Sequence, residues 1–382
     1  MAQQTAVFRM TAAEVFDRMR RGGNLFVLDV RNEDVYADWR IEGPSVRSAN
    51  VPYVALLDDL EALEGKLPPE PEPILVVCAK EGASQYVAEQ LSAGGRRSVS
   101  VLSGGMEAWS GHMHIARIGD LSGGGALYQV ARVGKGCLSY IVAAGGEAAI
   151  VDVARLIGPY EDFARRHNLK VRHLVDTHLH ADHISGGRAL AARQQAEYWL
   201  PPDDSGDAPF SCRPLTGARP LAVGGADVEI LPLQTPGHTA GSVSLAVDGR
   251  YLLTGDTLFV ESVGRPDLGG RAAELADQLY DTLFGAYRAL PEDLTVLPAH
   301  YAHLGEMDRE GRVQARLGDL FRDNEGLQIR DRAAFADRVT RGLPPQPHAF
   351  HEIRQVNMGR LAPGEREQAE MEIGPNRCAV HG

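Results

Sequence analysis

The chain of 382 residues is long enough for two domains, and its apolar fraction of 44% is ordinary for globular proteins. Its formal net charge is −12 and it has no basic run, which argues against nucleic acid and anionic membrane surfaces as partners. No stretch of about 18 apolar residues could span a bilayer. The four cysteines are widely spaced, and the N-terminus lacks a signal-peptide pattern. We therefore expect a protein of the reducing cytoplasm.

Strands and helices are predicted to alternate over residues 1–115. Thr11, with Glu14 three residues later, predicts a capped helix start. Continuous apolar runs predict buried strands at 25–30, 74–77 and 98–102, and a helix is predicted over 84–93. This alternation favours an α/β domain with a parallel sheet.

Cys78 stands where the second of these strands ends and a short loop leads into a helix. The N–H groups and dipole of a helix start favour a thiolate over a thiol, so Cys78 is a candidate reactive cysteine. A buried structural cysteine is the alternative. The candidate sulfur-site loop consists of Ala79, Lys80, Glu81, Gly82, Ala83 and Ser84.

Four segments around Cys78, at 29–31, 41–44, 50–52 and 102–109, occur in this order in rhodanese-like domains, and the region resembles that family. The resemblance implies that Cys78 carries sulfane sulfur as a persulfide. Ala83 stands where many thiosulfate-using members have a cation, and Glu81 would repel a dianionic donor. A docking or sensing role without turnover is therefore the alternative for this domain.

Residues 111–125 are rich in small and polar residues and predict a linker, with His112 and His114 in solvent. Beyond it, strands are predicted at 126–133, 137–144 and 148–153, which places Cys137 in a core strand. Helices are predicted over 160–167 and 271–290.

Histidines and aspartates gather where predicted strands end. A single loop after an apolar strand holds His178, His180, Asp182 and His183, and three later strands end near His238, Asp256 and His300. Imidazole and carboxylate together suit zinc, iron or manganese. Because strand ends can bring distant segments to one rim, we expect a shared metal site.

Together these four segments resemble the metallo-β-lactamase superfamily, from about residue 119 to about residue 320. The resemblance implies an αββα sandwich with its ligands on loops at one edge. It also implies one metal position at His178, His180 and His238 and a second at Asp182, His183 and His300, with Asp256 between them. A hydrolase of glyoxalase II type with two zinc ions per chain fits this ligand set.

Two segments are more specific: Gly264-Arg265-Pro266-Asp267 and the run over 177–187 resemble persulfide dioxygenases. That resemblance implies one Fe(II) per chain on His178, His238 and Asp256, with faces open for substrate and O2. His180, Asp182, His183 and His300 would then orient ligands and water. Arg265 would pair with Asp267 beside the site or meet an anionic substrate group.

We therefore expect an α/β rhodanese-like domain at 1–115, an αββα metallo-β-lactamase sandwich at 116–320 and a C-terminal extension at 321–382. The predicted function is oxidation of a low-molecular-weight thiol persulfide by O2 to sulfite. The alternatives are a glyoxalase II-type thioester hydrolase and a non-catalytic sulfur carrier or sensor. Glutathione persulfide is the first guess for the substrate, coenzyme A and other thiols stay open, and a homo-oligomer is possible.

The extension is predicted to contain a short helix at 333–339 and to end without helix or strand periodicity. Cys378 and His381 could form a loose redox or metal pair there, but a flexible end, or one docked on a neighbouring subunit, is the preferred interpretation. Cys212 lies in a Pro-rich loop and receives no role.

Overall fold

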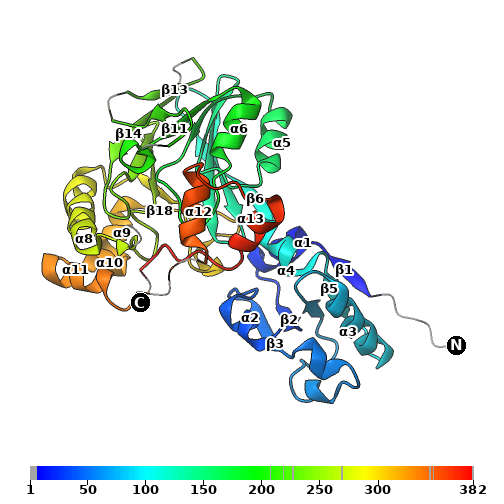
Figure 1. The fold of residues 1–382 in the computed structure, drawn as a ribbon. Helices are drawn as coiled ribbons and strands as arrows, with labels where there is room; N and C mark the ends of the chain where they lie inside the picture. The colour runs from blue at the N-terminus through cyan, green and yellow to red at the C-terminus, as the bar shows by residue number, and fades with distance from the viewer. Residues whose placement is uncertain are drawn as a thin grey trace. The chain divides into compact units, whose positions relative to one another are not determined.

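The computed structural model describes residues 7–380 except 207, 218, 226–227, 268–269, 344–345 and 347 (Figure 1). The chain divides into two compact units. Unit 1 comprises 1–114 with the short segments 132–135 and 303–311, and unit 2 comprises 115–131, 136–302 and 312–382. His381 lies outside the described residues.

Unit 1 is built on a parallel sheet with the strand order β1-β5-β4-β2-β3. Every residue of β2 and β4 is buried, as their continuous apolar runs predict. The strands are β1 Phe8–Met10, β2 Leu25–Asp29, β3 Val46–Asn50, β4 Ile74–Val77 and β5 Val99–Leu102. The helices are α1 Ala12–Arg20, α2 Glu33–Asp38, α3 Gly82–Ala93 and α4 Gly105–Gly111, with 3-10 turns at η1 Tyr53–Leu56 and η2 Glu61–Leu63.

Local sequence signals in unit 1 are confirmed at the start of α1, where Thr11 and Glu14 form the predicted capping box. The expectation that His112 and His114 lie in solvent is wrong. Both rings pack against Phe16, with centroid distances of 5.8 and 5.0 Å, and both are partly buried. Burial, together with the charge of His114, lowers the pKa of His112 to about 4.

Unit 2 contains two sheets. The first has the order β12-β11-β10-β9-β8-β7-β6 and the second the order β13-β14-β15-β16-β17-β18. The first sheet consists of β6 Met113–Asp120, β7 Ala126–Arg132, β8 Cys137–Ala144, β9 Glu147–Val151, β10 Lys170–Val175, β11 Glu197–Leu200 and β12 Arg213–Pro214. The second consists of β13 Leu221–Val223, β14 Val228–Gln234, β15 Val243–Val247, β16 Tyr251–Gly255, β17 Thr295–Pro298 and β18 Ala315–Arg316.

Helices flank both sheets, which gives the predicted αββα arrangement (Figure 1). Helices α5 (Gly158–Arg166) and α6 (Gly187–Gln194) lie beside the first sheet, and α8 (Ala272–Asp281) and α11 (Arg332–Thr340) lie beside the second. The predicted continuous helix over 271–290 is only partly correct, because α8 gives way to a π-helical turn at Thr282–Ala286 and a 3-10 turn at Tyr287–Ala289. The remaining helices are α7 Pro202–Ser205, α9 Leu317–Asp323, α10 Glu325–Gln328, α12 Phe350–Asn357 and α13 Glu365–Met371.

Two expectations about irregular chain are wrong. Much of the predicted linker over 111–125 is the edge strand β6 of the first sheet. The C-terminal segment is held within unit 2, where Cys378 is fully buried and Ala379 forms a β-bridge with Gly264. An edge strand needs only one hydrogen-bonded neighbour and tolerates polar residues, so the composition of β6 concealed it.

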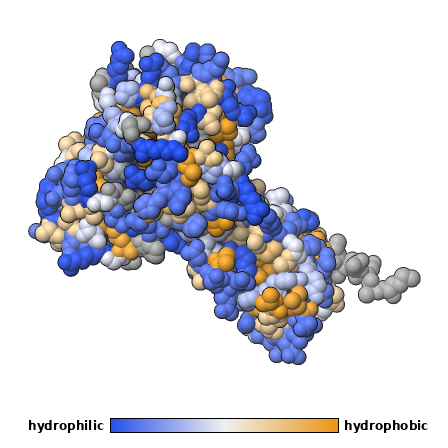
Figure 2. Space-filling view, viewed as in Figure 1, coloured by the Kyte–Doolittle hydropathy of each residue, from blue (hydrophilic) through white to orange (hydrophobic). Residues whose placement is uncertain are grey.

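The surface in Figure 2 is mostly hydrophilic, with apolar side chains in small groups. Exposed large apolar residues include Val54 and Leu57, at and just after η1. In the described part of the chain, none of the helices has both the length and the apolar character needed to cross a membrane.

Candidate metal centre

The seven candidate ligands lie together in unit 2, and each is at most 2% exposed. His178, His180, Asp182 and His183 occupy the loop that follows β10, and His238, Asp256 and His300 follow β14, β16 and β17. Strand ends therefore deliver all of them to one edge of the sandwich, as the sequence pattern predicts.

Asp256 stands between two groups of donors. Its Oδ2 lies 3.6 Å from His178 Nε2 and 3.4 Å from His238 Nε2, whereas its Oδ1 lies 3.2 Å from His300 Nε2. His300 Nε2 is in turn 3.5 Å from Asp182 Oδ2. One carboxylate oxygen thus faces each group.

The first group consists of His178, His238 and Asp256, whose donor atoms all lie within 4.8 Å of one another. A further buried group brings His180 together with Asp152 and Asp176. The arrangement around Asp256 Oδ2 is therefore two imidazoles and one carboxylate, the donor set typical of a facial triad.

Hydrogen bonds fix which ring nitrogen each histidine presents. His238 Nδ1 lies 2.9 Å from the carbonyl oxygen of Arg265, which can only accept, so Nδ1 carries the proton and Nε2 presents a lone pair. Thr177 Oγ1 donates to Asp152 and therefore accepts from His178 Nδ1 at 3.1 Å, which leaves His178 Nε2 as a lone pair too.

Asp152 is a residue that the sequence pattern did not single out. Its Oδ1 accepts from the backbone N–H of Thr177 at 2.8 Å and lies 3.1 Å from His180 Nε2. This carboxylate therefore fixes both His178, through Thr177, and His180. No signal in the sequence marked it beyond its position after β9.

Charge is distributed unevenly across the centre. Burial lowers the pKa of both His178 and His238, which keeps these rings neutral. Burial also acts to lower the pKa of His300, but Asp256 and Asp182 outweigh it and raise that pKa well above its ordinary value. Burial acts to raise the pKa of Asp256, but His300 and His178 outweigh it and lower that pKa.

These residues fit a metal ion. Among the described residues, buried donor atoms without a hydrogen-bond partner are concentrated here: Nε2 of His178, His183 and His300, Nδ1 of His180 and both carboxylate oxygens of Asp256. A buried polar atom left without a partner costs about 1–3 kcal/mol. So many at one point are explained by a cation that they would share, and their chemistry suits zinc or iron.

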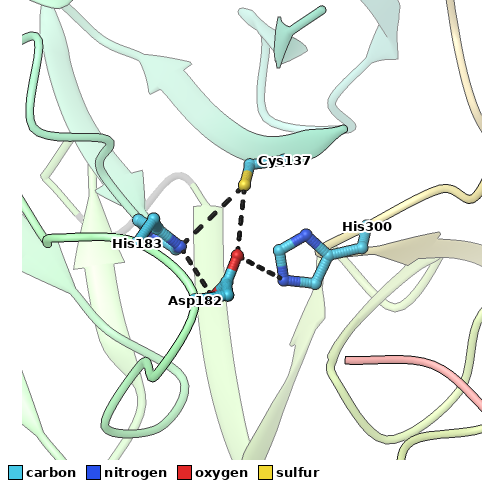
Figure 3. A group of neighbouring side chains, drawn as sticks. All are labelled: Cys137, Asp182, His183 and His300. Atoms are coloured by element: carbon cyan, nitrogen blue, oxygen red, sulfur yellow. Dashed lines mark hydrogen bonds and ion pairs between the residues drawn. The ribbon is translucent and has the colours of Figure 1, made fainter. Parts of the chain in front are cut away.

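Two cysteines border the centre. The sequence analysis took Cys137 for a core residue and gave Cys378 only as a member of a loose redox or metal pair with His381. Cys137 Sγ lies 3.4 Å from Asp182 Oδ2 and 4.0 Å from His183 Nδ1 (Figure 3), so its assignment as a core residue is incomplete. Cys378 Sγ lies within 4.8 Å of donor atoms of Asp256 and His300. The only sequence signal for Cys137 was its place at the start of a strand that follows a glycine turn.

The C-terminal extension holds the ligand loop in place. Asn357 Nδ2 donates to the carbonyl oxygens of His180 and His183, both at 2.9 Å, and its Oδ1 accepts from the Ser185 N–H. Glu372, which is fully buried, accepts from the Ile184 N–H at 2.9 Å. The preferred interpretation of a flexible or neighbour-docked end is therefore wrong for this part of the extension.

Arg265 forms the predicted pair with Asp267, in which Nε–Oδ1 is 2.6 Å and Nη2–Oδ2 is 2.8 Å. Its side chain is 1% exposed, and it also donates from Nη1 to the carbonyl oxygen of Arg377 at 3.0 Å. The backbone N–H of Arg265 bonds the carbonyl oxygen of Cys378 at 3.0 Å. Arg265 thus holds the segment that carries Cys378 against the centre.

In unit 1, Cys78 is 5% exposed, and its Sγ accepts from the Ser84 N–H at 3.4 Å. The Glu81 carboxylate accepts from the Gly104 N–H at 3.0 Å and forms an ion pair with Arg9, a neutralising contact that the sequence argument did not include. Lys80 is 82% exposed and lies 3.9 Å from Glu107. The loop is therefore organised around the sulfur, with its cation in solvent.

Comparisons with known proteins agree with this architecture. Residues 132–209 and 214–300 match the family model described as the metallo-beta-lactamase superfamily, and residues 11–112 match that of the rhodanese-like domain. A hydroxyacylglutathione hydrolase of Anaeromyxobacter dehalogenans is 38% identical over 231 residues, which cover 59% of this chain and 82% of that protein. The chain belongs to the metallo-β-lactamase superfamily. Its superfamily domain follows a rhodanese-like domain, so the predicted fold class is confirmed.

Two solved structures share the fold. A metallo-beta-lactamase from Staphylococcus aureus has 25% identity and a TM-score of 0.55, over 65% of this chain and 73% of that one. The structure of ETHE1 from Myxococcus xanthus has 25% identity and a TM-score of 0.54, over 62% of this chain and 100% of that one. Members of the superfamily are typically enzymes and the fold binds metal ions, so a metal-dependent enzyme is the coarse functional conclusion.

Proposed function

We propose that unit 2 is a persulfide dioxygenase that converts a low-molecular-weight thiol persulfide and O2 to sulfite and the thiol. The observation that carries the proposal is the donor set of His178, His238 and Asp256, whose donor atoms lie within 4.8 Å of one another, while His180 Nε2 faces Asp152 at 3.1 Å. The resemblance of Gly264–Asp267 to persulfide dioxygenases supports it. His178, His238 and Asp256 would hold Fe(II), which would supply the capacity to bind and activate dioxygen.

The reaction balances as RSSH + O2 + H2O giving RSH, sulfite and two protons. Three S–O bonds form on the outer sulfur, two to the oxygen atoms of O2 and one to the oxygen of water, the S–S bond breaks, and the four electrons lost by that sulfur reduce O2. Asp152, through Thr177, keeps the lone pair of His178 turned inward, and the Arg265 carbonyl does the same for His238. Arg265 and Asp267 would keep the covering segment closed over the site, and His180, Asp182, His183 and His300 would orient water and ligands.

We further propose that Cys78 carries sulfane sulfur in the rhodanese-like domain. Cys78 lies just before the N-terminal end of α3, and the Ser84 N–H donates to its Sγ. Both features support this role. A hydrolase relative named for a glutathione derivative supports a glutathione-type thiol, and we keep glutathione persulfide as the first substrate to test. The domain bounds 1–115, 116–320 and 321–382 and a cytoplasmic location stay predictions.

A glyoxalase II-type hydrolase with two metal ions is the second candidate. His180 Nδ1 is buried and lacks a hydrogen-bond partner among the described residues, and Asp256 turns one oxygen toward each donor group. Both features suit one metal position formed by three histidines, with a second metal position beside it. Hydroxyacylglutathione hydrolases among the relatives favour the same chemistry.

Protein purified without oxygen, with its metals quantified, should consume O2 and release sulfite when mixed with glutathione persulfide. His178→Ala should lose both bound iron and oxygen uptake. His173→Gln is the matched control, because His173 lies in β10 just before the loop and bonds Trp199 rather than the centre. Two zinc ions, no oxygen uptake and hydrolysis of a glutathione thioester would instead establish the second candidate.

A further inference from the structure

The second donor group contains a sulfur atom. Cys137 Sγ, Asp182 and His300 Nε2 gather with His183 so that one donor atom from each lies within 4.8 Å of the others (Figure 3). All four side chains are at most 5% exposed. The three residues that a superfamily member would place here are thus joined by a thiol from β8.

The backbone presets Cys137 beside His300. The two residues form an isolated antiparallel bridge, and the adjacent Leu138 N–H bonds the carbonyl oxygen of Ala299 at 2.7 Å. Residues opposite each other in such a bridge place their Cβ atoms about 4.5–5.5 Å apart. The ligand pair is therefore built by sheet geometry before any ion binds.

Gly136 makes this approach possible. Its φ is +76°, and a Cβ there would lie 2.9 Å from the carbonyl oxygen of Tyr301. Its own carbonyl oxygen accepts from His300 Nδ1 at 3.3 Å. In a neutral His300 ring this contact places the proton on Nδ1 and leaves the lone pair on Nε2, which has no hydrogen-bond partner among the described residues.

The separations match a tetrahedral zinc site. With Zn–S of about 2.3 Å and Zn–N or Zn–O of about 2.0–2.1 Å, tetrahedral ligands stand about 3.3–3.6 Å apart. The Cys137 Sγ–Asp182 Oδ2 distance is 3.4 Å, and the His300 Nε2–Asp182 Oδ2 distance is 3.5 Å. His183 Nδ1 lies 4.0 Å from Cys137 Sγ and 3.0 Å from Asp182 Oδ1, so zinc at this nitrogen would replace its hydrogen bond with Asp182.

We propose that Cys137 adds a fourth ligand to the second metal position, which the superfamily resemblance places at Asp182, His183 and His300, and that the position next to the His178 triad is thereby a closed zinc site. A thiolate selects zinc over harder cations, and four protein ligands leave no position for substrate. The triad has three donors and stays open. The two positions would thus hold different ions with different tasks, one structural and one catalytic. This inference goes beyond the proposed function: it gives Asp182, His183 and His300 zinc ligation in place of the orienting role, and it requires no step of the chemistry at the triad.

Cobalt(II) is the probe for the full-length protein. Wild-type protein loaded with cobalt should show a thiolate-to-cobalt charge-transfer band, and Cys137→Ser should lose the band and bind zinc more than about tenfold more weakly. Cys378→Ser is the matched control, because Cys378 is also buried against His300 but gathers only with Asp256 and His300. Cys212→Ser, in a partly exposed loop, controls for thiols elsewhere.

A band that persists in Cys137→Ser, or that vanishes in Cys378→Ser and not in Cys137→Ser, would overturn the proposal. X-ray absorption at the zinc edge of wild-type protein tests it without any variant: we expect one sulfur at about 2.3 Å, and a shell of nitrogen and oxygen alone would overturn it. A protein that shows the sulfur ligand but consumes no oxygen would refute the dioxygenase and leave the zinc site standing.

Discussion

Replacing Glu372 should test most directly whether the extension stabilises the ligand loop. Its carboxylate is fully buried, with Oε1 on the Ile184 N–H at 2.9 Å and Oε2 on Arg155 Nε at 2.9 Å. The Arg155 side chain is 16% exposed. Glu372→Ala therefore leaves a largely buried guanidinium without its carboxylate and strips one loop N–H of its acceptor.

Breaking a buried ion pair from one side costs about 3–5 kcal/mol, a range that already includes much of the lost N–H contact. For a unit of this size each kcal/mol shifts Tm by about 2–4 °C, so the transition of unit 2 should fall by on the order of 6–20 °C. Glu370→Ala is the control two residues away. Its exposed pair with Arg366 at the i,i+4 spacing should be worth less than about 0.5 kcal/mol.

Differential scanning calorimetry of the full-length variants measures both changes. Zinc and iron content after dialysis should also fall in Glu372→Ala, because the loop that it anchors carries four candidate ligands. A Tm within about 2 °C of wild type, or equal losses in the two variants, would refute the reasoning that the extension holds the loop.

Two further predictions concern unit 1. Because burial depresses the pKa of His112 to about 4 from the ordinary 6.5, the unfolded chain binds its proton first as pH falls. The free energy of unfolding should therefore decrease by about 1–2 kcal/mol as the pH falls from about 6.5 to 4, with the partial exposure of His112 taken into account. His112→Gln should flatten that loss in unfolding curves taken at pH 7 and 4.5, and an unchanged pH slope would contradict it. Cys78→Ser should abolish the one-sulfur mass increase expected after incubation with a sulfane-sulfur donor while oxygen uptake with glutathione persulfide continues. Cys212→Ser should keep both, and a mass increase retained in Cys78→Ser would place the sulfur elsewhere.

The sequence predicted those features whose physical cause is local. Strands buried on both faces are continuous apolar runs, so β2 and β4 were found nearly to the residue. That the seven candidate ligands would lie together could be predicted because their donor types cluster at strand ends, which needs only a strand prediction and the chemistry of imidazole. The capping box of α1 spans four residues and was equally visible.

The features that escaped depend on contacts between distant segments. Cys137 belongs to the centre because it pairs with His300, and Asn357 holds the backbone of His180 from 177 positions away. Neither residue differs locally from an ordinary strand cysteine or a helix-end asparagine. Their roles arise from register and docking, which composition and periodicity do not encode.

The extension and the metal centre should be thermodynamically coupled. The ligand loop contains buried donor atoms without hydrogen-bond partners among the described residues, and its imidazoles lie close to one another, with ring centroids 4.3 Å apart for His178 and His180. The folded conformation of this loop is therefore unfavourable in the absence of a cation. Asn357 and Glu372 offset part of that cost through the loop backbone. A metal ion offsets the rest through the side chains. Because both stabilise the same loop conformation, metal must tighten the docking of the extension by the same factor as the extension tightens metal binding. Protease resistance of the extension should therefore rise when metal is added, and an extension cleaved equally with and without metal would show that the loop is held by other means.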